Sequence, residues 1–349
     1  MTALFDVPAA AQRKTGPRVT PTAYLVLPAT ATRDEWLAAR REGIGASDVP
    51  AILGVSDYGT PRSVYYDKIG EAVDGAGEAA HWGTVLEEPV AREWARRNRS
   101  VVRRVGLVAH VDDPTLMCTL DRRVTECPLP ETRREQCALE VKLRSAFKAN
   151  RWHANLPDDI AGQMLWQLAV TGYDHLHYAV LVGGNDYRQG TVRRAEHEPT
   201  IRHIVTACKR FWAEFVQARV VPAADPEHGE RELDMYKRMH RQRGGLVAAD
   251  PVETREAALA YAQHQRAESS EKKQKAAAYA ELLRLMGGGT ALLADGHVAA
   301  EVREVNRAPR VNLERLAERY PDAYRDCVVS KTGPQLYLNP EFVKMAEAL

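Results

Sequence analysis

The chain lacks any long hydrophobic run: no apolar stretch approaches the roughly 20 residues that a membrane-spanning helix needs. The N-terminal segment Met1–Pro28 shows no charged-then-apolar signal pattern, so we expect neither membrane insertion nor secretion. Cysteine is scarce, and the five residues between Cys118 and Cys327 are an odd and scattered set. A disulfide framework is therefore not expected, and the default setting is the reduced cytoplasm.

An excess of charge of one sign is also missing. The chain has 48 Lys+Arg against 47 Asp+Glu, for a formal net charge of +1. This balance excludes binding to nucleic acid by bulk charge alone, although it permits a local basic groove. With 349 residues and a hydrophobic fraction of 45%, the chain is large enough for one sizeable domain with an appendage.

Three regions follow from the patterning. Residues 1–28 mix proline, alanine and threonine without a period and are expected to form a loose N-terminal arm. Residues 29–224 alternate helical and strand patterns, which favours a mixed α/β core. Residues 225–349 are predicted to be a C-terminal appendage of helices and a β-hairpin turning at Asp295-Gly296. The predicted helices are 32–41, 82–98, 159–171, 201–219, 231–243 and 251–286, and the predicted core strands are 106–111, 116–124, 137–143 and 177–184.

Two carboxylates on adjacent predicted strands, Asp121 and Glu140, carry the clearest chemical signal. If the strands pair, both carboxylates converge at one end of the sheet, where with a backbone carbonyl they suit Mg²⁺ or Mn²⁺. Lys142 follows Glu140 by two residues and shares its face, so it would lie beside the metal and act on an attacking water. The same E-x-K pattern at Glu271–Lys273 is expected to be a solvated helix face. Glu140 differs because its strand is apolar, where an unpaired carboxylate is costly.

Other residues could complete such a site. Gln163, on the helix after the E-x-K strand, could reach the lysine or the water, and Glu87 could supply a third carboxylate. Arg40 and Ser47 offer a cation and a hydroxyl beside a predicted helix start, a common way to hold a phosphate. Taken singly, Ser47 would be only a helix cap and Arg40 only a surface cation.

Together these segments resemble the YqaJ-type viral recombinase family, which is similar to phage lambda exonuclease and belongs to the PD-(D/E)XK nucleases. The resemblance keeps the family's order and spacing over residues 32–220. The matching stretches are Glu35–Gly54, Trp82–Ala91, Cys118–Asp121, Leu139–Lys142 and Ala161–Gly172.

The resemblance implies a PD-(D/E)XK (restriction-endonuclease-like) α/β core, with a mixed sheet flanked by helices, and a Mg²⁺ cofactor that Mn²⁺ can replace. It makes Lys142 the catalytic lysine and Gln163 the motif glutamine. It assigns the metal to Asp121, Glu140, the Val141 carbonyl and Glu87.

The resemblance also places Arg40, Ser47 and Thr119 where lambda-type enzymes hold the 5′-phosphate of a DNA end. Arg41 is an alternative to Arg40, since both precede the glycine turn. One departure concerns the aspartate: the family usually reads Pro-Asp-Gly, whereas Leu120 and Arg122 flank Asp121 here. That replacement leaves the carboxylate but alters the local backbone path.

The implied activity is 5′-to-3′ digestion of linear double-stranded DNA ends, leaving 3′ single strands for a strand-annealing partner in phage-type recombination. The resemblance further implies a ring-like homotrimer in the cytoplasm, that of the host cell if the protein is phage-encoded. Two alternatives remain open: a site- or structure-specific endonuclease on the same core, and a catalytically dead module that binds DNA ends. The intact triad of Asp121, Glu140 and Lys142 argues against the dead module.

A zinc site is not predicted. Cys118, Cys127 and Cys137 lie near one another in the sequence, but no C-x-x-C pair or suitably spaced histidine accompanies them. The histidines at 175 and 177 belong to no motif and are expected to be structural.

Overall fold

The computed structural model describes residues 16–72, 77–132, 136–152, 156–239, 250–286, 291–294, 297–301, 313–328, 340 and 344. The chain divides into two compact units, Met1–Arg243 and Gly244–Leu349. The sequence analysis placed the boundary between residues 224 and 225, and this division falls after Arg243. Helix α7 (Gly229–Met239) belongs to the first unit because it packs on α3 (Pro61–Lys68), where Arg62 pairs with Glu232 at 3.1 Å.

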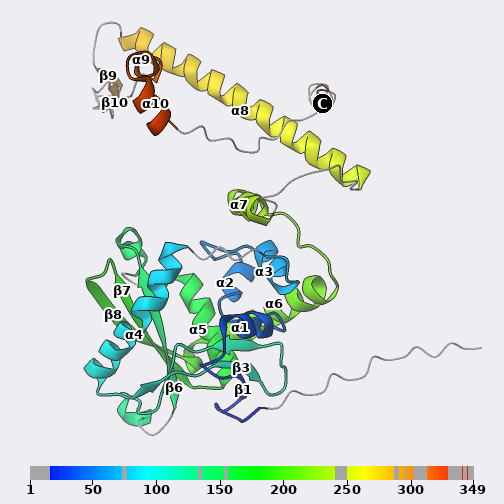
Figure 1. The fold of residues 1–349 in the computed structure, drawn as a ribbon, viewed down its shortest axis with the longest axis vertical. Helices are drawn as coiled ribbons and strands as arrows, with labels where there is room; N and C mark the ends of the chain where they lie inside the picture. The colour runs from blue at the N-terminus through cyan, green and yellow to red at the C-terminus, as the bar shows by residue number, and fades with distance from the viewer. Residues whose placement is uncertain are drawn as a thin grey trace, which may run out of the picture. The chain divides into compact units, whose positions relative to one another are not determined.

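The main sheet of the first unit has five strands in the order β2-β5-β6-β7-β8 (Figure 1). β6 and β7 run parallel, and the other neighbours are antiparallel, so the expected mixed α/β sheet is confirmed. The strands are β2 (Val102–Arg103), β5 (Arg122–Val124), β6 (Cys137–Arg144), β7 (His175–Val182) and β8 (Asp186–Arg193).

A second, three-stranded antiparallel sheet has the order β1-β3-β4, with β1 (Ala23–Leu27), β3 (Leu107–His110) and β4 (Met117–Thr119). β1 lies in the segment expected to be a loose arm; it is ordered because Ala23 and Tyr24 are buried against β3. The single strand predicted over 116–124 is two strands, β4 and β5, which join different sheets. Leu120 and Asp121 form the break between them.

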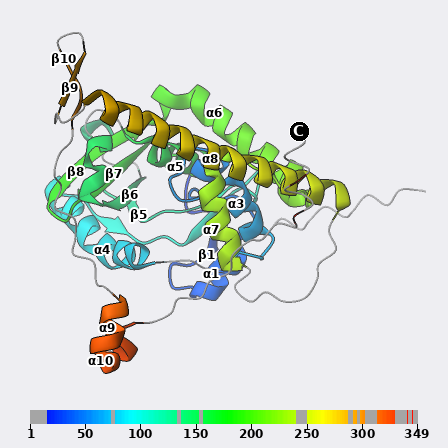
Figure 2. The same cartoon turned by 90° about the horizontal axis from the view of Figure 1, so that it is seen from above.

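Helices cover both faces of the main sheet, and Figure 2 shows α4 (Glu78–Asn98) and α5 (Asp158–Thr171) on opposite sides of it. Successive β6 side chains point to opposite faces. Accordingly Leu139 and Val141 pack with Trp94 of α4, whereas Ala138 belongs to the core that includes Met164 of α5. Because of this alternation, neighbouring residues on β6 pack into different cores.

The helices around the site begin and end as local chemistry predicts. α1 (Arg33–Arg40) starts at a capping box between Thr32 and Glu35. α5 has acidic residues in its first turn and ends at Gly172, whose φ of 72° favours glycine. The connecting α2 (Val49–Ile52) has only four residues, and α6 (Arg194–Phe211), packed on α5, continues into a π-helical turn, Trp212–Gln217. Three short 3₁₀ segments complete this unit: η1 (Pro130–Thr132), η2 (Ala146–Trp152) and η4 (Pro226–His228).

The second unit contains a long helix, α8 (Pro251–Met286), with the predicted bounds. An antiparallel pair, β9 (Ala291–Ala294) and β10 (His297–Glu301), corresponds to the predicted hairpin, and its expected turn at Asp295-Gly296 lies outside the described residues. Two short helices follow, α9 (Leu313–Arg319) and α10 (Pro321–Cys327). Within the described parts of the chain, no helix is both long and apolar enough to span a bilayer.

Candidate active site

The break between β4 and β5 brings the Asp121 carboxylate to the neighbouring strand β6. Its Oδ2 accepts a hydrogen bond from the Val141 backbone N–H at 2.8 Å. This bond holds the carboxylate beside the E-x-K segment, as the sequence predicted. Leu120 and Arg122, which replace the expected proline and glycine, therefore still allow the aspartate to reach β6.

Glu140 is the most heavily hydrogen-bonded carboxylate of this cluster, although its side chain is almost fully buried. Its Oε1 accepts a hydrogen bond from Gln163 Nε2 at 2.6 Å and pairs with the Lys142 ammonium. Its Oε2 accepts from Gln167 Nε2 at 2.7 Å. The structure thus brings Glu140, Lys142 and Gln163 together, and both carboxylate oxygens have partners in the low-dielectric interior.

Gln167 was missed by the sequence analysis. It lies one helical turn after Gln163 on α5, so both amides project toward β6. The i, i+4 spacing of two glutamines in an otherwise apolar helix was the available signal.

Negative charge accumulates at this cluster. Burial, together with charge repulsion from Glu140 and Glu87, raises the pKa of Asp121 to about 8, although Lys142 and the Val141 hydrogen bond oppose the rise. For Lys142, burial works to lower the pKa, yet the attraction of Glu140 and Asp121 prevails and raises it, so the ammonium stays charged. A divalent cation bound to oxygen ligands would relieve the carboxylate repulsion.

Glu87 lies near this cluster, but its carboxylate is already paired with the guanidinium of Arg122. Arg122, which is almost fully buried, donates from Nη1 to Glu87 Oε1 at 2.5 Å and from Nη2 to Glu88 Oε2 at 2.6 Å. The arginine at the position of the family's glycine thus ties α4 to the start of β5. Glu87 and Asp121 line the same cavity, of about 420 Å³.

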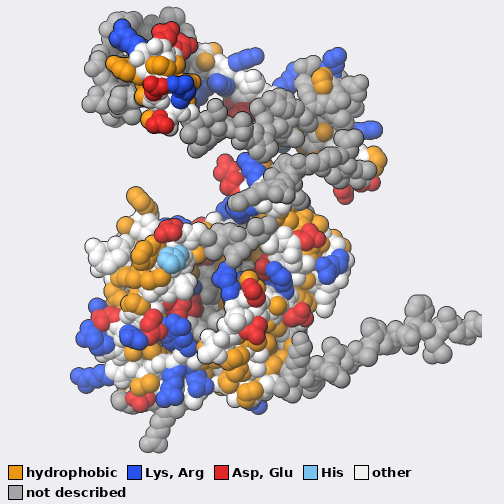
Figure 3. Space-filling view, in the orientation of Figure 1, with side chains coloured by type: hydrophobic (Ala, Val, Ile, Leu, Met, Phe, Trp, Pro, Cys, Tyr) orange, Lys and Arg blue, Asp and Glu red, His pale blue; other side chains and the backbone are white. Residues whose placement is uncertain are grey.

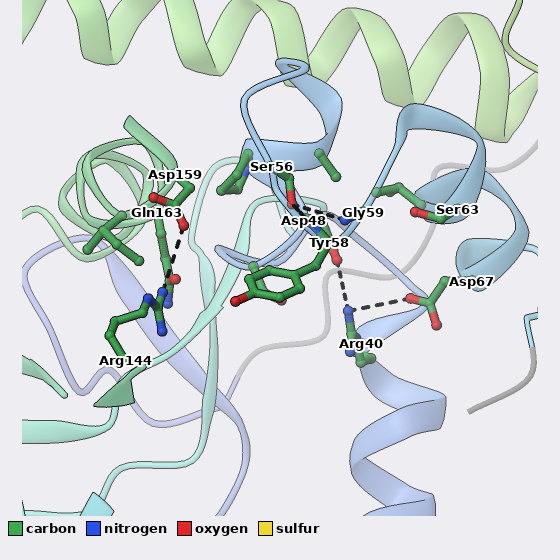
Figure 4. Close-up of a pocket in the computed structure, with 15 residues that line it drawn as sticks. Arg40, Asp48, Ser56, Tyr58, Gly59, Ser63, Asp67, Arg144, Asp159 and Gln163 are labelled. Atoms are coloured by element: carbon green, nitrogen blue, oxygen red, sulfur yellow. Dashed lines mark hydrogen bonds and ion pairs between the residues drawn. The ribbon is translucent and has the colours of Figure 1, made fainter. Parts of the chain in front are cut away.

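Gln163 lines a second cavity, of about 410 Å³ (Figure 4). Arg40 and Ser47 line it, as do Arg144 and several hydroxyl groups. Arg40 Nη2 pairs with Asp48 Oδ1 at 2.8 Å and with Asp67 Oδ2 at 3.4 Å. Arg144 was not expected here; it lies 3.7 Å from Asp159. The hydroxyls belong to Ser47, Ser56, Tyr58 and Ser63.

The remaining residues assigned to phosphate binding are placed differently. Of the two adjacent arginines, Arg40 lines the cavity, whereas the Arg41 guanidinium lies against Gly70. Thr119 lines the cavity of Asp121 and accepts a hydrogen bond from Trp36 Nε1 at 3.3 Å. Arg40 stacks on the same Trp36 ring, 4.9 Å from its centroid, so Trp36 links the two groups.

Ser47 does not cap a helix. The residue before α2 is Asp48, and its carboxylate pairs with Lys68 at 2.6 Å and with Arg40 instead of capping the helix. Burial would raise the pKa of Asp48, but Lys68 and Arg40 lower it overall. A four-residue helix provides little dipole, so any phosphate affinity of this cavity comes from side chains. On the face of the first unit shown in Figure 3, acidic and basic side chains are interspersed.

Comparisons with known proteins agree with the residue pattern. Residues 35–174 match the family model of the YqaJ-like viral recombinase domain. The "Uncharacterized protein YqaJ" of Bacillus subtilis (strain 168) is 31% identical over 207 residues, which is 58% of this chain and 62% of that protein. The match therefore spans less than two thirds of that relative's length.

The solved structures to which this chain is similar include an alkaline exonuclease (LHK-Exo) from Laribacter hongkongensis, alone and in complex with dAMP. Each is 18% identical, with a TM-score of 0.43, and covers 58% of this chain and 98% of that one. SSO0001 is 12% identical, with a TM-score of 0.29 over 51% of this chain and 86% of its own. The segment that matches the YqaJ-like viral recombinase domain, residues 35–174, contains Asp121, Glu140, Lys142 and Gln163.

Proposed function

We propose that this protein is a Mg²⁺-dependent DNA exonuclease that digests linear duplex ends in the 5′-to-3′ direction. The observation that carries the proposal is the network around β6, where Asp121 is bonded to Val141 and Glu140 to Lys142 and Gln163. This network lies within the YqaJ-like domain.

The residues present fit a hard divalent cation. Asp121 and Glu140 would provide oxygen ligands with the Val141 carbonyl, and a bound cation would offset the burial and the carboxylate repulsion that together raise the Asp121 pKa to about 8. When bound, Mg²⁺ supplies Lewis acidity and lowers the pKa of a coordinated water. Mn²⁺ would substitute, since it takes the same ligands. Glu87 contributes negative charge while Arg122 holds it.

The chain's own side chains have separate tasks in this proposal. Lys142 is a charged donor beside Glu140, positioned to hold the attacking water and the scissile phosphate. Gln163 and Gln167 each hold one oxygen of Glu140, so the carboxylate keeps one orientation. Because Gln163 also lines the cavity of Arg40 and Arg144, that cavity adjoins the reacting centre.

We assign the cavity of Arg40, Ser47 and Arg144 to the terminal 5′-phosphate. Guanidinium groups and hydroxyls suit a phosphate, and the pairs of Arg40 with Asp48 and Asp67 keep its side chain in place. Thr119 would support the adjoining nucleotide across Trp36, and Arg41, which lies at Gly70, is the less favoured cation.

The end-recognition assignment predicts a preference for 5′-phosphorylated ends. Arg40→Ala should digest 5′-phosphate and 5′-hydroxyl duplexes at similar, reduced rates, because the charge that distinguishes them is gone. The measurement is the ratio of the two rates, with Arg210→Ala, an exposed arginine paired with Glu214, as the control that keeps the wild-type ratio. An unchanged ratio in Arg40→Ala would remove Arg40 from this role.

Linear and covalently closed duplex DNA, each with and without Mg²⁺, test the activity itself. The exonuclease degrades the linear form only with Mg²⁺ and leaves the closed circle intact, and 5′- and 3′-labelled strands report the direction. Cutting of closed circles would favour the endonuclease alternative. Tight binding to linear DNA without cleavage under any divalent cation would favour the end-binding module.

Two further expectations concern assembly. A ring-like homotrimer would enclose duplex DNA and make digestion processive, and a single-strand annealing protein would take over the 3′ strands. Sedimentation of the purified chain, and capture of labelled 3′ overhangs by an added annealing protein, test these two points.

A further inference from the structure

Four thiol and imidazole groups meet on the α4 face of the main sheet, away from the carboxylate cluster. Cys127, Cys137, His175 and His177 place one ligand atom each within 4.8 Å of all the others. None of the four is more than 3% exposed. Cys127 precedes η1, Cys137 starts β6, and both histidines open β7, so the group joins three segments of the chain.

The separations suit a single tetrahedral ion. Cys127 Sγ lies 3.2 Å from His175 Nε2 and 3.5 Å from His177 Nε2. A zinc tetrahedron with Zn–S of about 2.3 Å and Zn–N of about 2.0 Å separates sulfur and nitrogen by about 3.5 Å. A Cys₂His₂ iron–sulfur centre would instead divide its ligands between two irons and spread them farther apart.

Charge and surroundings agree with zinc at this place. Two thiolates neutralise the two positive charges of Zn²⁺, so the loaded site is uncharged overall and can be buried in an apolar core. That core includes Val124, Leu139, Ala179 and Trp94, and the Trp94 ring lies 5.1 Å from the His177 ring. Thiolate and imidazole ligands also favour zinc over the Mg²⁺ expected at the carboxylates.

One imidazole is oriented by a neighbour outside the cluster. His177 Nδ1 lies 2.8 Å from the hydroxyl oxygen of Thr191, its partner across the β7–β8 pair. This bond leaves Nε2 facing the two cysteines, as metal-binding histidines are commonly held by their second nitrogen.

We propose that Cys127, Cys137, His175 and His177 bind one Zn²⁺ in a closed structural site. The ion ties the connection between β5 and β6 to the parallel pair of β6 and β7. It therefore steadies β6, which carries Glu140 and Lys142 on its other face. The site takes part in no bond-breaking step, and it stands whether or not the nuclease proposal holds.

Metal content of the full-length chain tests the site directly. We expect about one tightly held Zn²⁺ in protein purified without chelator, and a visible spectrum with a thiolate-to-cobalt band after replacement by Co²⁺. The carboxylate variant Glu140→Gln must keep both signals, because oxygen ligands give no thiolate band. Wild-type protein that shows no thiolate-to-cobalt band with excess Co²⁺ overturns the proposal.

Two variants distinguish the ligands from general folding effects. Cys127→Ser should lose the band, whereas Cys208→Ser, a buried cysteine of α6 outside the cluster, should keep it. Thr191→Val, a change at an exposed side chain, should retain the band and weaken Co²⁺ affinity by about tenfold. Retention of an unaltered band in Cys127→Ser, or unchanged affinity in Thr191→Val, contradicts the proposed ligand set.

Discussion

Strand β6 presents two chemically different clusters on its two faces. Toward α5, Glu140 and Lys142 meet Asp121 and two glutamine amides. Toward α4, Cys137 meets a second thiol and two imidazoles. The first cluster offers hard oxygen atoms beside a cation, and the second offers soft sulfur with nitrogen.

The clusters differ in access as much as in chemistry. Asp121 and Gln163 each line a cavity, so the carboxylate side of β6 adjoins two cavities. The Cys/His cluster is enclosed by Trp94 and apolar side chains. An open site with spare charge suits catalysis, whereas a closed site with satisfied ligands suits stability.

Burial shifts titration on both faces toward the uncharged form. It raises the pKa of Asp121 to about 8, with Glu140 adding to the effect. It lowers the pKa of His177 to about 3, with His175 and Arg193 adding to it. The same low dielectric thus favours a neutral imidazole on one face and leaves an excess of carboxylate repulsion on the other.

Glu140→Gln is expected to give the largest effect, because it should impair the carboxylate face of β6 and leave the Cys/His face unchanged. If Glu140 is a metal ligand as we propose, its loss should lower the rate of digestion of linear duplex by about 10³-fold or more, since metal catalysis is worth several kcal/mol. Zinc content should not change. Single-turnover digestion and metal analysis measure the two effects, with Glu214→Gln, an exposed carboxylate, as the control. Wild-type activity in Glu140→Gln would refute the assignment of the carboxylate face.

Lys142→Ala should have the next largest effect. The lysine acts on water and phosphate, so removing it should cost about 10²-fold in rate while Mg²⁺ binding persists. Calorimetry with Mg²⁺ and rate measurements separate the two properties. Lys209→Ala, at an exposed lysine of α6 paired with Asp113, serves as the control. If Lys142→Ala no longer binds Mg²⁺, the lysine has a structural role instead.

Removal of zinc should act on stability more than on chemistry. At free zinc 100-fold above its dissociation constant, binding adds about 2.7 kcal/mol to the free energy of unfolding. Urea unfolding of wild type with zinc and with chelator measures this difference, and Cys127→Ser should show none. If the urea midpoint of the wild type is the same with zinc and with chelator, the second cluster contributes no metal-linked stability.

The smallest effect is expected from Gln167→Leu. Loss of the hydrogen bond to Glu140 Oε2 loosens one metal ligand and should lower the digestion rate by about tenfold, without altering zinc content. Gln189→Leu, a change at an exposed side chain of β8, is the matched control. Equal rates for Gln167→Leu and wild type would mean that Gln163 and Lys142 suffice to orient the carboxylate.

Motifs confined to one element were predicted well. Glu140 and Lys142 share a face because a strand repeats every two residues, and Gln163 reaches them because α5 returns along β6. Helix α5 was predicted to within one residue at its start, since acidic residues and Gly172 mark its two ends. The long helix α8 was predicted with its observed bounds.

Features that depend on strand pairing were not predictable in the same way. The stretch predicted as one strand over 116–124 divides at Leu120 and Asp121 because its halves pair with different partners, β3 and β6. The pairing that orders β1, and the α3 contacts that keep α7 in the first unit, involve residues far apart in sequence. No local pattern encodes them.

The sequence by itself indicated the hard-ligand cluster, because strand periodicity puts Glu140 and Lys142 on one face of β6 and Asp121 directly precedes β5, the strand that pairs with β6. Only the tertiary structure decided the soft-ligand cluster. The parallel pairing of β6 and β7 brings Cys137 near His175 and His177, and the chain's return from β5 adds Cys127. These ligands span 50 residues between Cys127 and His177, so their meeting depends on sheet order and not on spacing.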